Sequence, residues 1–167
     1  PYNLIRALAL NPDGSLWVGC NAGIFRWQKS APEIVLDGKN GWLGLSNTFV
    51  TAVHLDGRNN LWVGTYGGLC RLAENGRSNG SPLRDATALT NAFFLTELTA
   101  EKTAYDQINV LFEDREGSLW VGAKDGLHQL KDGPFTTCST RDGLSYNNVM
   151  SVLPGRSGGL WVSTWGG

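Results

Sequence analysis

The sequence has no hydrophobic run long enough to cross a membrane as a helix. It has no excess of one charge, because 14 basic residues balance 15 acidic ones, and such a chain does not attract nucleic acid or an anionic membrane. Cysteine is scarce, and the 3 cysteines lack the spacing of metal ligands. There are only 2 histidines. These absences leave a charge-balanced chain whose hydrophobic content, 41%, is too high for disorder.

Glycine and tryptophan are abundant, at 22 and 7 residues, and both recur in one motif. The stretch GSLWVGCNAGIFRW returns as NNLWVGTYGGLCRL, GSLWVGAKDGLHQL and GGLWVSTWGG. The leucines before the first tryptophan of each copy are 45, 58 and 41 residues apart: Leu16, Leu61, Leu119 and Leu160. Within each copy, Ile or Val always lies 11 residues earlier and Gly 7 residues later. Constant internal spacing with variable intervals predicts rigid repeats joined by adjustable connectors.

Each repeat predicts short antiparallel strands. An apolar run such as IRALALNP gives the first strand, a Gly/Asp/Asn turn follows, and LWVG gives the second. A tight turn then ends at the repeated glycine, which indicates a backbone angle barred to other residues. IFRW and its counterparts give the third strand, and EIVLDG and PFTTCST give a more variable fourth.

Four antiparallel strands in about 40 to 45 residues match the size of a propeller blade. The sequence therefore predicts an all-β chain, a partial β-propeller of about four blades. The expected blades are 1–43, 44–104 with an insertion at about 73–104, 105–142, and an incomplete 143–167. Such a chain begins in one connector and ends within a blade.

The first two strands of each repeat are nearly continuously hydrophobic, which fits sheets covered on both faces by neighbouring blades. The repeated tryptophans are then large core residues between sheets: Trp17, Trp62, Trp120 and Trp161. Cys20 aligns with Thr65, Ala123 and Thr164, a position that favours a small residue. The end blades are each expected to leave one apolar face uncovered, which further blades or a second copy would cover.

The connectors GWLGLSNTFV and TRDGLSYNNV, followed by LWVGT and GGL, resemble one family closely: the two-component regulator propeller repeat. The resemblance implies a seven-bladed propeller in the extracytoplasmic, periplasmic sensor region of a membrane-anchored bacterial hybrid histidine kinase. It also implies oligosaccharides as a candidate ligand class, and no kinase activity in this segment. Three features depart from the family pattern: the turn at 154–157, Ser163, and the connector TAYDQI.

Neither the histidines nor the acids predict catalysis. His54 and His128 fall in the first and third strands without a recurring acidic partner, which favours core histidines. The turn NPDGS lacks counterparts with enough oxygen ligands for calcium, and DGSLW matches a sialidase Asp-box only in Gly and Trp. No pair of carboxylates, nucleophile elbow or phosphate loop stands out. The segment is predicted to be no enzyme and to hold no metal or cofactor.

Binding is the remaining class of function. The turns between second and third strands all emerge on one propeller face and present one residue each: Asn21, Tyr66, Lys124 and Trp165. Trp42, in the connector before the second blade, is expected on the same face. Aromatic residues there are able to stack on a sugar ring or a partner.

The leading hypothesis is a ligand-sensing propeller segment of a bacterial two-component sensor, with an oligosaccharide as the candidate ligand. A protein-interaction scaffold is the second hypothesis, and a propeller lyase or glycosidase is the third. No nucleic-acid partner is expected.

Overall fold

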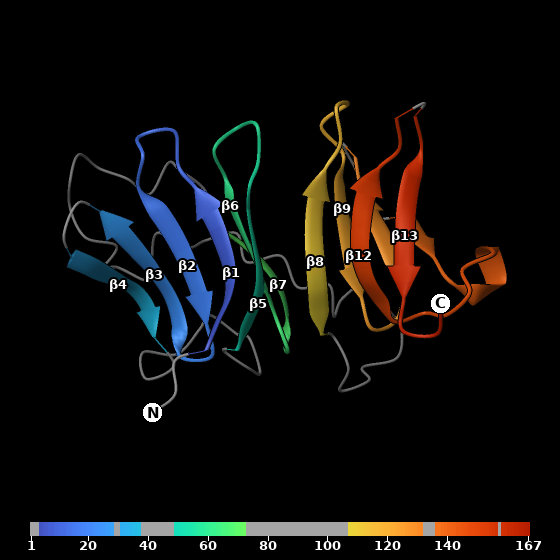
Figure 1. Ribbon diagram of the computed structural model, residues 1–167, viewed down its shortest axis with the longest axis horizontal. Helices are drawn as coiled ribbons and strands as arrows, with labels where there is room; N and C mark the ends of the chain where they lie inside the picture. The colour runs from blue at the N-terminus through green and yellow to red at the C-terminus, as the bar shows by residue number, and fades with distance from the viewer. Residues whose placement is uncertain (1–3, 29–30, 38–48, 73–106, 132–135, 157) are drawn as a thin grey trace.

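The computed structural model of the chain describes residues 4–28, 31–37, 49–72, 107–131, 136–156 and 158–167. Its strands form four separate antiparallel sheets that follow one another in chain order (Figure 1). The first sheet holds β1 (Ile5–Leu10), β2 (Leu16–Cys20), β3 (Gly23–Gln28) and β4 (Ala31–Asp37). The second holds β5 (Val50–Leu55), β6 (Leu61–Thr65) and β7 (Gly68–Leu72). The predicted all-β class is confirmed.

The third sheet holds β8 (Ile108–Glu113), β9 (Leu119–Ala123), β10 (Leu127–Leu130) and β11 (Thr136–Cys138). A 3-10 turn, η4 (Thr140–Asp142), leads to the fourth sheet of β12 (Val149–Pro154) and β13 (Leu160–Thr164). The strand order in each sheet follows the chain, so strands that are consecutive in the sequence are neighbours in the sheet. The predicted insertion at 73–104 and Trp42 lie outside the described residues.

The sheets are arranged about a common axis. Their first strands meet in succession, β1 with β5, β5 with β8, and β8 with β12. The Gly of LWVG permits this close approach, because a Cβ on Gly64 would lie 2.5 Å from Ile108 Cγ2 in the next sheet. Gly19 and Gly122 stand in the same relation to Val50 and Val149. The architecture is that of part of a β-propeller.

The turns between second and third strands depend on a glycine with positive φ. Gly23, Gly68, Gly126 and Gly167 have φ values of 135°, 127°, 159° and 125°. Residues with a side chain rarely adopt these angles. The predicted reason for the repeated glycine is confirmed.

The turn between the first and second strands is held by one side chain. In the second sheet, Asp56 Oδ1 accepts from the backbone N–H groups of Arg58 and Asn60, both at about 2.9 Å or less. Asp56 Oδ2 accepts from Trp62 Nε1 at 2.9 Å. One carboxylate therefore closes the turn and also satisfies the buried indole N–H.

The same arrangement recurs in two other sheets. Asp114 Oδ2 accepts from Trp120 Nε1 at 2.8 Å, and Asn11 Oδ1 accepts from Trp17 Nε1 at 3.1 Å. In the fourth sheet, Gly155 takes this position, so the side-chain acceptor is missing there. This role of the turn residue is absent from the sequence-based prediction.

The repeated tryptophans pack toward the sheet that follows. Trp17 is 1% exposed among Val50 and Val63, and Trp62 is 3% exposed among Ile108 and Leu119. Trp120 is partly buried against the fourth sheet. The prediction of a core residue is confirmed for Trp17 and Trp62.

Trp161 contradicts that prediction, because 74% of it is exposed. Among the described residues no sheet follows β12 and β13 to cover it. Its position in the repeat is the same as that of Trp17, but burial of this tryptophan depends on the next blade, not on its own.

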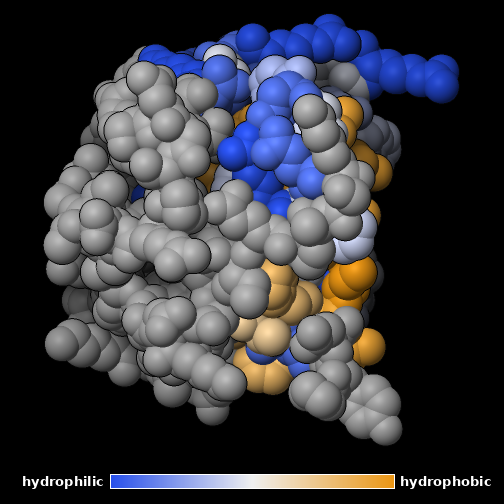
Figure 2. Space-filling view, turned by 90° about the vertical axis from the view of Figure 1, so that its left-hand side faces the viewer, coloured by the Kyte–Doolittle hydropathy of each residue, from blue (hydrophilic) through white to orange (hydrophobic). Residues whose placement is uncertain are grey.

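The four sheets form a fan about the common axis, and the first sheet, at its other end, also exposes apolar side chains. Leu8 and Leu10 on β1 are 56% and 69% exposed. Their counterparts Val53 and Leu55 in the second sheet pack into the cluster against the first sheet. Figure 2 faces the left-hand side of Figure 1 and shows hydrophobic residues in orange beside residues drawn grey, with polar residues gathered at the top. The expected uncovered faces are present.

Candidate functional site

The turns between second and third strands lie on one face of the propeller, the lower side in Figure 1. Three of the predicted binding residues are fixed there by their backbone. The N–H at this position donates to the carbonyl oxygen of the residue before the first strand: Tyr66 to Phe49, Lys124 to Gln107 and Trp165 to Asn148, at 3.2, 3.0 and 2.9 Å. The backbone is therefore held in place while the side chain projects from the sheets.

Lys124 and Trp165 meet in a pocket of about 540 Å³ between the third and fourth sheets. We call it the aromatic pocket, and it is lined by Lys124, Thr140, Tyr146, Asn147, Asn148 and Trp165. Trp165 is 72% exposed and Tyr146 is 52% exposed, so both rings present surface to solvent. Two aromatic rings beside a lysine and two amides suit a ligand that has a flat apolar face and hydroxyl groups.

Hydrogen bonds hold the amides of the aromatic pocket. Asn147 Oδ1 accepts from the backbone N–H of Thr140 at 2.7 Å. Asn148 Oδ1 accepts from Asn109 Nδ2 at 2.8 Å, which ties the connector to β8. The sequence-based prediction missed Tyr146, Asn147 and Asn148. The sequence feature that indicates them is the stretch SYNNV directly before β12. Its last Asn, Asn148, accepts the backbone N–H of Trp165 through its carbonyl oxygen.

The other predicted residues do not join this pocket. Tyr66 packs on Phe49, with ring centroids 5.6 Å apart, and the guanidinium carbon of Arg6 lies 5.9 Å from its ring centre. Asn21 Oδ1 accepts from the backbone N–H of Leu4 at 3.2 Å. The structure thus brings together two of the four turn residues, and Trp42 lies outside the described residues.

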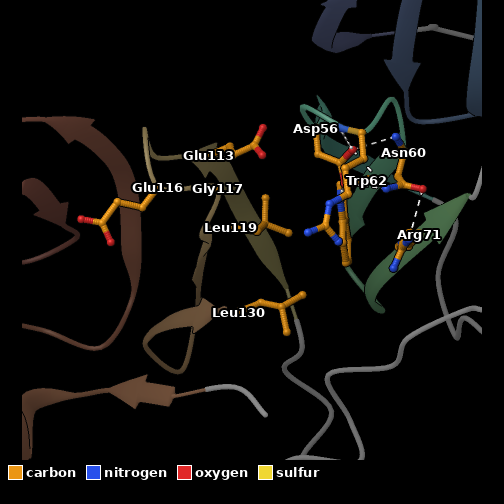
Figure 3. Close-up of a pocket in the computed structure, with 10 residues that line it drawn as sticks. Asp56, Asn60, Trp62, Arg71, Glu113, Glu116, Gly117, Leu119 and Leu130 are labelled. Carbon is orange, nitrogen blue, oxygen red and sulfur yellow. Dashed lines mark hydrogen bonds between the residues drawn. The ribbon is translucent and has the colours of Figure 1, made fainter. Parts of the chain in front are cut away.

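A second pocket lies on the opposite face of the propeller, between the second and third sheets (Figure 3). We call it the inter-sheet groove, and its volume is about 320 Å³. The turn after β5, Trp62 and Arg71 form one wall, and Glu113, Glu116, Leu119 and Leu130 form the other. Both arginines of this lining, Arg58 and Arg71, come from the second sheet.

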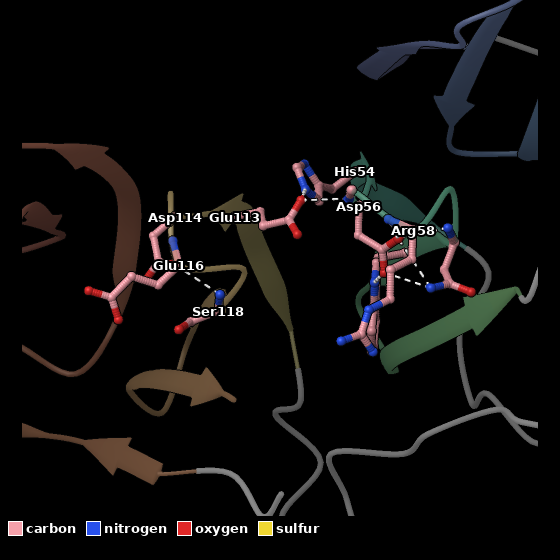
Figure 4. Close-up of polar contacts among 10 residues, drawn as sticks. His54, Asp56, Arg58, Glu113, Asp114, Glu116 and Ser118 are labelled. Atoms are coloured by element: carbon pink, nitrogen blue, oxygen red, sulfur yellow. Dashed lines mark hydrogen bonds and ion pairs between the residues drawn. The ribbon is translucent and has the colours of Figure 1, made fainter. Parts of the chain in front are cut away.

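A polar contact joins the two sheets beside this groove (Figure 4). His54 Nε2 lies 3.4 Å from Glu113 Oε2, which also accepts from the backbone N–H of Gly57 at 2.9 Å. His54 is half-buried on β5. The end of β8 therefore holds the second-sheet turn through one carboxylate.

His128 is a core residue, as predicted, and is 2% exposed. Its Nδ1 lies 2.9 Å from Thr137 Oγ1 and its Nε2 lies 3.0 Å from Asp125 Oδ1. The acid near His128 and the acid near His54 occupy unrelated positions of the repeat. Each of the two histidines therefore lies beside an acid that the sequence did not indicate.

The turn aspartates are held in their charged form. Desolvation raises the pKa of Asp56, but hydrogen bonds from Asn60, Trp62 and Arg58 together lower it by more. The pKa therefore lies below the ordinary 3.8. Asp114 shows the same direction of pKa shift, with desolvation outweighed by hydrogen bonds from Trp120, Ser118 and Glu116. These carboxylates are fully engaged inside their turns.

The described residues include no group of three or more His, Cys, Asp or Glu side chains placed to hold a metal ion. Cys70 is buried, and this burial raises the pKa of its thiol to about 12. No helix in the described part of the chain is long and apolar enough to cross a membrane.

Comparison with known families decides the class of the repeats. Residues 44–67, 104–125 and 143–166 each match the family described as "Two component regulator propeller". These three segments are two component regulator propeller repeats. The three matched segments run through the first strand, the LWVG strand and the turns of the second, third and fourth sheets. No curated protein sequence matches the chain.

Solved structures with similar folds support the propeller. One is described as the extracellular domain of a hybrid two component system from B. thetaiotaomicron, with a TM-score of 0.74 and 18% identity, over 95% of this chain and 20% of that one. Virginiamycin B lyase from Staphylococcus aureus has a TM-score of 0.65 and 14% identity, over 99% of this chain and 50% of the lyase. PorZ of the type-IX secretion system of Porphyromonas gingivalis has a TM-score of 0.55 and 14% identity, over 98% of this chain and 31% of PorZ.

At these identities the likeness concerns the fold alone. The repeats of this chain span half or less of each of these propeller proteins.

Proposed function

We propose that the chain is a non-catalytic, ligand-binding part of the extracytoplasmic sensor of a bacterial two component system. The observation that carries the proposal is the aromatic pocket, formed within repeats of the two component regulator propeller family. The similar extracellular domain from B. thetaiotaomicron supports the location outside the cytoplasm. The sensor as a whole would be anchored in the membrane by parts of a longer protein.

An oligosaccharide is the ligand class that fits the aromatic pocket. Trp165 and Tyr146 offer ring faces for the apolar side of a sugar, and Lys124 and Asn147 lie where hydroxyl groups would be bound. The pocket spans two blades, so a ligand held there would contact both the third and the fourth sheet. A ligand shifts a receptor between two arrangements only when it binds them with different affinity, and contact with two blades supplies such a difference.

Isothermal titration calorimetry of the chain with a panel of oligosaccharides tests the proposal. We expect saturable heat from at least one of them. Trp165→Ala should weaken that binding about tenfold, because an aromatic contact and its apolar burial together contribute about 1–2 kcal/mol.

Trp27→Ala is the matched control, because Trp27 is an exposed tryptophan on β3 outside the aromatic pocket. It should leave the affinity unchanged. No heat from any oligosaccharide with folded protein, or equal losses from the two variants, would refute the proposed site.

A further inference from the structure

Two asparagines of the aromatic pocket have side-chain amides of fixed orientation. The backbone N–H of Thr140 donates to the side chain of Asn147 at 2.7 Å. A backbone N–H only donates, so the atom of Asn147 that it meets is Oδ1 and not Nδ2. The NH2 group of Asn147 is therefore the part of the amide that this bond leaves open.

The orientation of Asn148 follows from two linked hydrogen bonds. Asn109 Nδ2 donates to the backbone carbonyl oxygen of Val149 at 2.7 Å, and a carbonyl oxygen only accepts. The same Nδ2 lies 2.8 Å from the side chain of Asn148, so the atom that it meets there is Oδ1. Gln107 Nε2 donates to Asn109 Oδ1 at 2.8 Å, which agrees with this orientation of Asn109. In both pocket amides, the protein uses the acceptor and leaves the donors.

The polar groups that remain for a ligand are therefore mainly donors. No described residue accepts a hydrogen bond from Nδ2 of Asn147 or Asn148. Trp165 lines the same pocket, is 72% exposed, and has an indole N–H that only donates. Among the described residues that line the pocket, none is an aspartate or a glutamate. A ligand that brings acceptors and negative charge thus meets donors there and no carboxylate.

We propose that the aromatic pocket prefers an oligosaccharide that contains a uronic acid, and that Asn147 and Asn148 determine this preference. The assignment rests on the proposed function, since it concerns the ligand of the same pocket. A sugar hydroxyl both donates and accepts, so it bonds to an amide oxygen as well as to an NH2 group. A carboxylate only accepts, and it forms stronger, charge-assisted bonds with N–H donors. The fixed orientation of the two amides therefore favours the uronate over the neutral sugar.

Calorimetry with matched trisaccharides tests the preference. The members of each pair differ only at C6 of the sugars, carboxylate against hydroxymethyl, in the gluco, galacto and manno series. We expect at least one uronate to bind about tenfold or more tightly than its neutral partner, because hydrogen bonds to a charged group contribute more than neutral ones.

Asn148→Asp keeps an acceptor for Asn109 but replaces the NH2 group by a second carboxylate oxygen. Binding of the uronate should fall about tenfold or more, through the lost donor and the repulsion of like charges, while binding of the neutral partner should change much less. Asn147→Asp makes the same exchange beside Thr140 and should have the same effect. Loss of selectivity, with Tm retained, separates a role in recognition from a merely structural one.

Gln28→Glu is the matched control, because it makes the same change from amide to carboxylate at an exposed residue of β3 outside the aromatic pocket. It should leave both affinities unchanged. Equal or tighter binding of the neutral trisaccharides would overturn the uronate assignment and leave the proposed function standing. An unchanged preference in both asparagine variants would overturn the role of the amides. No heat from any trisaccharide with folded protein would count against the uronate assignment and the oligosaccharide pocket together.

Discussion

At the scale of single residues, the aspartate in the turn between the first and second strands has two roles. Asp56 closes its turn through Oδ1 and accepts the indole N–H of Trp62 through Oδ2. Trp62 is nearly fully buried between two sheets, so its N–H has no access to water. The carboxylate therefore connects the local geometry of a turn to the packing of two blades.

Asp56→Ala is expected to lower the free energy of unfolding by about 1–3 kcal/mol, because it leaves a buried indole donor without an acceptor. Asp56→Asn should cost less, since Asn11 accepts from Trp17 at the same position of the first repeat. Urea unfolding followed by tryptophan fluorescence measures both changes. Equal stability of the alanine variant and the unchanged chain would show that the hydrogen bond contributes nothing.

Acid pH offers a second test of the same carboxylate. The pKa of Asp56 lies below 3.8 in the folded chain, so its contribution to stability is present above the unfolded pKa. That contribution is lost as the pH falls through the lower, folded pKa. The stability difference between the unchanged chain and Asp56→Asn should therefore shrink below about pH 4. A difference that grows on acidification would contradict the direction of the shift.

At the scale of strands, the glycine of LWVG sets how closely two blades approach. A Cβ on Gly64 would lie 2.5 Å from Ile108 Cγ2 and 2.8 Å from Ile108 Cβ. Ile108 is fully buried and β-branched, so its side chain has little freedom to move aside. In the fourth repeat Ser163 takes this position and is exposed. The need for glycine is therefore a property of the interface between blades.

Gly64→Ala is expected to destabilise the chain by about 1–3 kcal/mol, as overpacking of a close contact does. Ser163→Ala is the matched control, because it places the same residue at the equivalent, exposed position of the fourth repeat. It should change the free energy of unfolding by less than about 0.5 kcal/mol. Comparable effects of the two substitutions in chemical denaturation would show that the strand tolerates a Cβ between blades.

The strands and the turns with positive φ were predictable from the sequence because each depends on residues within one repeat. The exposure of Trp161 was not, since burial of this residue depends on a neighbouring sheet. The sequence predicted that Lys124 and Trp165 lie on the same face of the propeller, but not that they line one pocket. The pocket itself also needs Tyr146 from a connector, and the inter-sheet groove needs Glu113 and Leu119 of the third sheet to face Trp62 of the second.

At the scale of the whole molecule, the two ends of the fan present the two halves of one repeated interface. Inside the fan, Trp17 of one sheet packs against the residues around Val53 and Leu55 of the next. Leu10 at one end and Trp161 at the other are the exposed counterparts of Leu55 and Trp17. We propose that a blade of the same repeat covers each end, either in a longer chain or in a second copy.

The chain alone is therefore expected to associate as its concentration rises, because exposed apolar faces of this kind favour contact. Size-exclusion chromatography with light scattering measures the mass across a dilution series. Leu10→Lys combined with Trp161→Lys should shift the chain toward the monomer. A lysine on either end face makes it costly to bury that face against a second copy. Gln28→Lys adds a charge at an exposed polar residue of β3 and should leave the mass unchanged. A monomer at every concentration would contradict the proposal, because it would show that the two end faces stay exposed to water although the equivalent faces of the inner sheets are buried.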